Sequence, residues 1–174
     1  MRATPIIGIA TGLAVLGAVG VAAQQQDHMA MPMDTRQPLD FPTHMHKHML
    51  MNMRSHFEAL GEIVAALGEG NGAKASNIAN ERLGLQSPAA AACLKPGTKP
   101  DGANMSPMGD MAAMMAEYMP PHMREMGYAM HESASAFAVE AAKMPPGGDA
   151  KPALKALAQV TQNCAACHAE YRLK

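Results

Sequence analysis

The chain has 174 residues, with 14 lysines and arginines against 15 aspartates and glutamates, and a formal net charge of −1. This length suits one domain, and a charge so close to zero argues against a nucleic-acid partner. Methionine is abundant, tryptophan is absent and no run of residues alternates between apolar and polar, so the composition predicts an all-α protein.

The first 23 residues have the features of a secretory signal peptide. Arg2 provides the positive charge, Ile6 to Val21 is an apolar run, and Ala22-Ala23 offers a small-residue cleavage site. The alternative is a membrane anchor, although the run falls short of the roughly 20 residues that span a bilayer. We expect cleavage after Ala23, which predicts a periplasmic protein with no remaining membrane span.

Residues 24–42 are polar and aperiodic, which predicts a flexible arm containing methionine and histidine. Residues 43–174 form the predicted domain. Its first helix is expected over 43–67 with Thr43 as the N-cap, and a second helix over 73–83. Apolar residues spaced three and four apart predict the inward face of the first helix: Met45, Met49, Leu50, Met53, Phe57, Leu60, Val64 and Leu67.

A loop composition at 95–104 separates these helices from the rest of the domain. We expect a short helix over 106–118, a long helix over 121–143, and a last helix over 150–173 with Asp149 as its N-cap. The methionines spaced along this region are interpreted as adaptable core residues. Long amphipathic helices with short connections predict an antiparallel four-helix bundle.

The last predicted helix carries Cys164-Ala-Ala-Cys167-His168, the attachment signature of a c-type haem. Two cysteines three residues apart lie on one helical turn, where each can add to one vinyl group of the porphyrin. The adjacent His168 then lies under the iron as its proximal ligand. The export signal strengthens this prediction, because bacteria attach haem to c-type cytochromes outside the cytoplasm.

The motif continues through Tyr171 and Arg172, and the whole closing segment resembles the cytochrome c′ and cytochrome c556 family. The resemblance covers residues 43–174 and implies a four-helix bundle with one covalent haem on the C-terminal helix. It implies that Tyr171 takes the place of a family aromatic residue and that Arg172 lies near the haem edge. From there the arginine can tune His168 or pair with a propionate.

In this family the sixth position of the iron separates electron carriers from gas-binding proteins. Residues 53–70 match the family's first-helix frame, with leucines at the two later methionine positions, which implies that Met53 lies opposite His168. Methionine–histidine ligation implies a low-spin electron carrier. Met49 and His56 compete for this role, and the alternative for Met53 is an ordinary core position.

Two residues of the family pattern are replaced here. Met49 stands where the family has an arginine, which leaves the anchoring of a propionate open on that side. The family's third-helix tryptophan is absent, and Tyr128 and Phe137 are the candidates for that wall of the haem site.

The resulting hypothesis is a protein that is not an enzyme and that carries single electrons between periplasmic redox partners. No Ser/His/Asp grouping, phosphate loop or pair of carboxylates in the sequence indicates hydrolysis or group transfer. The alternative within the family is a five-coordinate haem protein that binds NO or CO. The resemblance is also compatible with a homodimer.

The alternative outside the family is periplasmic copper binding by segments rich in methionine and histidine, at 28–33 and 44–51. Thioethers with imidazoles suit Cu(I), and imidazoles suit Cu(II). His44, His46 and His48 converge only if their segment is not helical, because alternate residues of a helix point to different faces. Copper therefore remains a secondary cofactor in this hypothesis.

The remaining thiol, Cys93, has two readings. It is either a small buried thiol or the source of an intermolecular disulfide in an oxidising compartment. A zinc site would need Cys93 together with Cys164, Cys167 and His168, and the haem motif already accounts for the last three.

Overall fold

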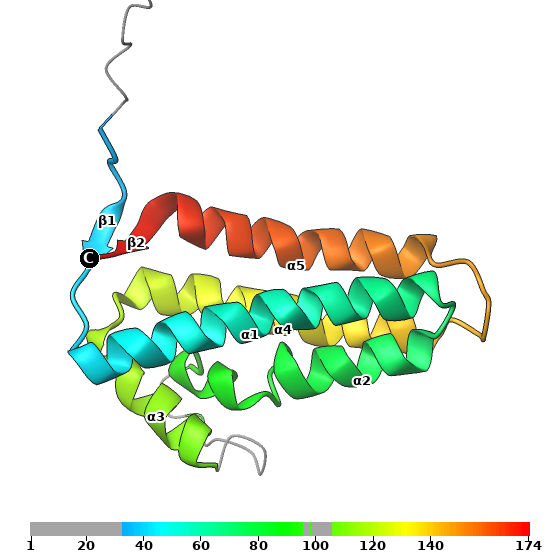
Figure 1. Ribbon diagram of the computed structural model, residues 1–174, viewed down its shortest axis with the longest axis horizontal. Coiled ribbons are helices and arrows are strands. Elements are labelled where there is room, and N and C mark those ends of the chain that lie inside the picture. Colours follow the sequence, from blue (N-terminus) through cyan, green and yellow to red (C-terminus); the bar gives the residue numbers. More distant parts are fainter. Residues whose placement is uncertain (1–32, 96–97, 99–105) are drawn as a thin grey trace, which may run out of the picture. The chain divides into compact units, whose positions relative to one another are not determined.

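Helices dominate the part of the chain that the computed structural model describes, residues 33–95, 98 and 106–174, which confirms the all-α class (Figure 1). The predicted signal peptide and residues 24–32 of the predicted arm lie outside the described residues. Residues Asp34–Lys174 belong to one unit, and the fold is described for that unit. Within the described residues, no helix is both long and apolar enough to cross a membrane.

All of the predicted helices are present. They are α1 (Thr43–Gly68), α2 (Gly72–Arg82), α3 (Pro107–Met115), α4 (Pro121–Ala142) and α5 (Lys151–Glu170). Two short 3-10 helices, η1 (Pro88–Ala92) and η2 (Ala116–Tyr118), complete the helical segments of the described chain. The largest difference is at the end of α5, which stops at Glu170 instead of continuing to residue 173.

The N-caps differ from the prediction at two helices. Pro42 caps α1 in place of Thr43, because the Pro42 carbonyl accepts the first helical hydrogen bond, from His46 N at 2.9 Å. Ala150 caps α5, although the Asp149 carboxylate accepts a hydrogen bond from Lys151 N at 3.0 Å. Asp149 therefore stabilises the start of α5 from one position earlier than expected.

A small parallel sheet joins the two ends of the unit. Strand β1 (Gln37–Leu39) pairs with β2 (Tyr171–Leu173) in the register Gln37–Tyr171 and Leu39–Leu173. Thus residues 37–39, expected within an arm without regular structure, form a strand. The side chains of Leu39 and Tyr171 are buried in the same apolar cluster, so the pairing also buries apolar surface. Three residues are too few to show a strand periodicity in the sequence.

The helices pack in a chain of neighbours: α1 contacts α2, α2 contacts α4, and α4 contacts α5. Their shared core is built mainly of alanines around a few large side chains. It contains Ala59, Ile63, Ala66, Ala75, Ala79, Leu83, Ala134, Phe137, Ala138, Ala141, Ala153, Leu157 and Val160. Small side chains allow helices to approach closely, and they define the inward face more than large apolar residues do.

For this reason the predicted inward face of α1 is wrong at three positions. Phe57 is 79% exposed, Val64 is 55% exposed and Leu50 is 38% exposed, whereas Ala59 and Ile63 are fully buried. The buried stripe instead runs through polar side chains at Asn52 and His56 before it reaches these core residues.

The contact between α2 and α4 depends on a glycine. A Cβ atom at Gly72 would collide with the Ala141 carbonyl oxygen and lie 2.8 Å from Met144 Cβ. We predict that Gly72→Ala lowers the free energy of unfolding by about 1–3 kcal/mol, as overpacking does. Urea unfolding followed by circular dichroism measures this change.

Gly61 provides the matched control, because a Cβ there meets nothing within 4 Å on the exposed side of α1. Gly61→Ala should raise the free energy of unfolding by roughly 0.5–1 kcal/mol, through the better helix propensity of alanine. Equal effects of the two substitutions would contradict this account of the α2–α4 contact.

Candidate functional site

A cavity of about 670 Å³ lies among α1, α4, α5 and the two strands. Its volume falls within the range of about 300–1,000 Å³ that is typical of cofactor and small-molecule sites. All of the site residues that the sequence predicted line this one cavity: Met53, Cys164, Cys167, His168, Tyr171 and Arg172. The fold therefore brings together side chains from α1 and from the C-terminal segment, more than a hundred positions apart in the sequence.

Helix α5 presents the cysteine–histidine motif to the cavity. Cys164 and Cys167 are half-buried, and His168 is exposed. Immediately before the motif, Asn163 Nδ2 donates hydrogen bonds to Ala129 O and Ser133 Oγ, both at 3.1 Å. These bonds fasten α5 to α4 and fix the direction in which the motif faces.

Three thiols line the cavity, because Cys93 joins the two motif cysteines there. Burial raises the pKa of Cys164, and burial together with Cys164 and Glu170 raises the pKa of Cys167 to about 11. Burial raises the pKa of Cys93 to about 12. All three are therefore protonated at neutral pH, and the burial of Cys93 favours its reading as a buried thiol over a disulfide with a second chain.

The described part of the chain contains no group of three or more histidine, cysteine, aspartate or glutamate side chains placed to hold a metal ion. This finding gives the zinc alternative no support. The histidines proposed for copper lie in α1, where His44 is exposed and His48 is buried. Since that segment is helical, the condition under which His44, His46 and His48 converge is not met.

Methionines form much of the cavity wall. Those lining it are Met49, Met53, Met115, Met119, Met123, Met126 and Met130. Burial of Met115, Met119, Met123 and Met130 agrees with the interpretation of these positions as adaptable core, whereas Met108, at the start of the same run, is 46% exposed. The wall residues that we expected, Tyr128 and Phe137, do not line the cavity. Phe137 is fully buried in the alanine-rich core, and the Tyr128 ring lies 4.7 Å from Lys95 Nζ.

The three α1 residues considered for the sixth ligand all line the cavity. Met53 is half-buried, whereas Met49 and His56 are buried. His56 Nε2 has no hydrogen-bond partner, and its ring meets the ring of His131 edge-on with centroids 5.7 Å apart. His131 Nδ1 lies 2.7 Å from the Leu83 carbonyl oxygen, which requires that this nitrogen carry the proton.

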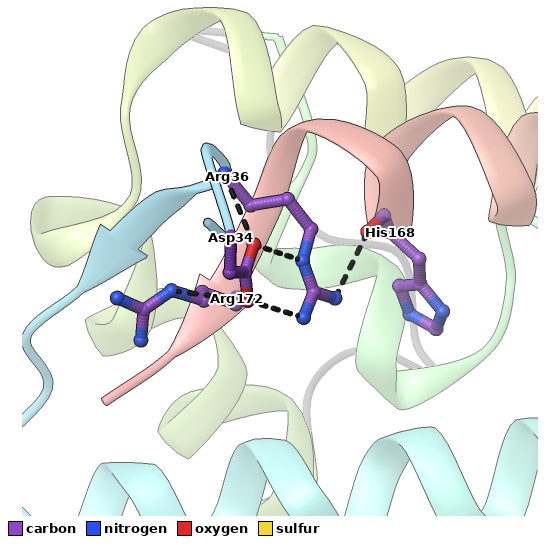
Figure 2. A network of polar contacts seen from close by, with 4 residues as sticks. All are labelled: Asp34, Arg36, His168 and Arg172. Atoms are coloured by element: carbon purple, nitrogen blue, oxygen red, sulfur yellow. Dashed lines mark hydrogen bonds and ion pairs between the residues drawn. The ribbon is translucent and has the colours of Figure 1, made fainter. Parts of the chain in front are cut away.

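Two arginines reach the cavity from the paired strands (Figure 2). Arg36, one residue before β1, donates from Nη1 to the His168 carbonyl at 3.3 Å and from Nη2 and Nε to the Asp34 carboxylate at 2.8 and 2.9 Å. Arg172 Nε lies 3.5 Å from the same carboxylate. Hydrogen bonds from Arg36 lower the pKa of Asp34 to about 2, so Asp34 is ionised throughout the neutral range.

Sequence analysis identified Arg172 and missed Arg36 and Asp34. Both missed residues lie in the predicted arm, and no motif links them to the C-terminal segment. Only the pairing of β1 with β2, which the sequence does not indicate, places them beside His168.

Comparison of the chain with protein-family models, with curated proteins and with solved structures finds no match. The resemblance to the cytochrome c′ and c556 family therefore rests on the C-terminal motif and the first-helix frame. What the site can do chemically follows from the side chains that line its cavity.

The buried imidazoles of His56 and His131 predict a loss of stability below neutral pH. Burial, with smaller contributions from His131, Arg82 and His168, lowers the pKa of His56 to about 3, and burial lowers that of His131 to about 4. Both side chains stay neutral in the folded chain, while the unfolded chain binds their protons as the pH falls through about 6.5. The stabilisation is complete above that pH and is lost below it, by up to about 1.4 kcal/mol per pH unit for each histidine.

Urea unfolding of the chain made without attached haem, between about pH 7 and 5, measures this slope. His56→Gln should reduce it by less than about half, because His131 remains and burial also lowers the pKa of His48, which adds to the slope. His44→Gln, on the exposed side of α1, is the matched control and should leave the slope unchanged. A stability that does not vary over this range would contradict the burial of these two imidazoles.

Proposed function

We propose that the chain is an exported monohaem c-type cytochrome that carries single electrons between periplasmic partner proteins and is not an enzyme. The observation that carries the proposal is the convergence of Cys164, Cys167 and His168 on one cavity with Met53 and Arg172. The signal peptide predicted over residues 1–23 supports export. The proposal further describes α1, α2, α4 and α5 as an antiparallel four-helix bundle, a reading supported by their successive contacts.

The chemistry of the cavity fits a haem. A porphyrin is a large apolar ring with two carboxylates, and the cavity offers a wall of thioethers and two arginines. One of these arginines, Arg172, has a buried Nε with no hydrogen-bond partner and only a 3.5 Å ion pair with Asp34, so it has capacity to pair with a further anionic group. The two thiols and the imidazole of the motif are all on the cavity side of α5.

Each of these residues has a distinct role in the proposal. Cys164 and Cys167 hold the haem through thioether bonds, and His168 provides the proximal nitrogen. Met53 provides the axial sulfur, a soft ligand suited to iron. When bound, the haem supplies the one-electron couple. The methionines that line the cavity exclude water from the iron. The lower local dielectric that results changes the reduction potential.

The role of Met53 can be tested by optical spectroscopy of mature protein made in cells that attach c-type haem. The parent protein should give a low-spin spectrum, with the weak far-red band of an iron–sulfur bond, that does not change with CO. We predict that Met53→Ala abolishes the far-red band and gives a reduced protein that binds CO at once, because the substitution removes the ligand atom.

Met126→Ala is the matched control, since Met126 lines the same cavity from α4 and is also half-buried. Its spectrum should remain that of the parent. A Met53→Ala spectrum identical to the parent's would assign the sixth ligand to Met49 or His56 instead. A high-spin parent that takes up CO would replace electron transfer by NO or CO binding as the function.

A further inference from the structure

We propose that Arg36, held by Asp34, acts with Arg172 to bind a carboxylate of the haem, and that this pair of arginines sets the reduction potential. The inference deepens the proposed function and rests on it. It offers a cation from another segment of the chain, since Met49 stands where the related family has an arginine.

The backbone of the two strands brings these side chains together. Pro38 is paired with Arg172 in the parallel register. Residues 34–36, which precede β1, therefore lie beside the end of α5. The hydrogen bond from Arg36 Nη1 to the His168 carbonyl places the guanidinium over the last turn of that helix. Arg36 is thus adjacent to His168, the proposed proximal ligand. It comes from the segment before β1, which no sequence motif connects to His168.

The charges at this place leave an excess of positive charge. Asp34 is the shared partner of both arginines, so the three side chains together carry one net positive charge. Asp34 engages Arg36 with short bonds to Nε and Nη2, which orders that guanidinium. The Asp34 carboxylate also lies 3.5 Å from Arg172 Nε, which is an ion pair but is too long for a good hydrogen bond.

Arg172 is therefore incompletely satisfied. Its Nε is buried and has no hydrogen-bond partner, although the rest of the side chain is partly exposed. A buried donor of a charged group is costly to leave unpaired, and a carboxylate is the acceptor that guanidinium groups match best. Arg36 and Arg172 both line the cavity, with the Asp34 carboxylate between their guanidinium groups (Figure 2), so a carboxylate of a ligand bound there can pair with one cation while it lies in the field of the other.

This arrangement predicts the direction in which each substitution shifts the reduction potential. A cation beside the haem favours the reduced form, which carries one positive charge fewer, and an anion favours the oxidised form. Arg36→Gln should therefore lower the reduction potential, and Asp34→Asn should raise it. The ionisation of the haem carboxylate makes the reduction potential depend on pH. Arg36→Gln should raise the pKa of that carboxylate by about one unit, because a neighbouring cation lowers a carboxyl pKa by one unit or more.

The experiment is a redox titration of the purified holoprotein at several pH values, followed by its optical spectrum. Lys155→Gln is the matched control, since Lys155 is exposed on α5, does not line the cavity and loses the same charge. Arg36→Lys keeps the charge and should retain most of the parent potential. If Arg36→Gln does not accumulate as folded holoprotein, Arg36→Lys and Asp34→Asn provide the test.

Opposite shifts in Arg36→Gln and Asp34→Asn, with Lys155→Gln unchanged, would support the proposal. Shifts of the same sign would show a general disturbance of the site and overturn it. So would a potential and pH profile of Arg36→Gln equal to those of the control. A parent chain that carries haem while Arg36→Gln changes nothing defeats this inference alone, whereas a parent without covalent haem defeats the proposed function as well.

Discussion

The site depends on how the last turn of α5 is held. Asn163 bonds α5 to α4 on one side of the motif, and the pairing of β1 with β2 fixes the chain on the other side. Between these two attachments lie both motif cysteines and His168. Because the motif is fastened at both ends, its side chains are held toward the cavity, and Cys164 and Cys167 also pack against the two apolar clusters of the interior.

The interior divides into two regions of different chemistry. One is the alanine-rich core of α1, α2, α4 and α5, where small side chains let the helices approach. The other is rich in methionine and includes Met45, Met49, Met115, Met119 and Met123, packed with Leu39 and Tyr171. Flexible thioether side chains can line a cavity of irregular shape. The division explains why the cavity forms at the end of the unit where the strands lie and not along the alanine-rich contacts.

The sequence was sufficient for the helices and for the C-terminal part of the site. Strong helix formers, prolines at helix starts and glycines at helix ends indicate the boundaries, and Cys164 to His168 form a local motif. It was insufficient where distant segments meet. Arg36 reaches His168 through a three-residue strand with no periodicity. Phe57 was expected inside because large apolar residues in the first helix are spaced three and four apart, but small residues make the packed face. Tyr128 and Phe137 were expected at the cavity because the family tryptophan is absent, but methionines and His131 line it in their place.

The most direct test is the mass of the tryptic peptide 156–172 from mature protein made in cells that attach c-type haem. The account predicts that this peptide carries the mass of one haem, while the peptide containing Cys93 carries a free thiol. The double substitution Cys164→Ser with Cys167→Ser should remove the added mass. A parent peptide with two free thiols, from a folded chain, would contradict the assignment of this cavity to a covalently bound haem.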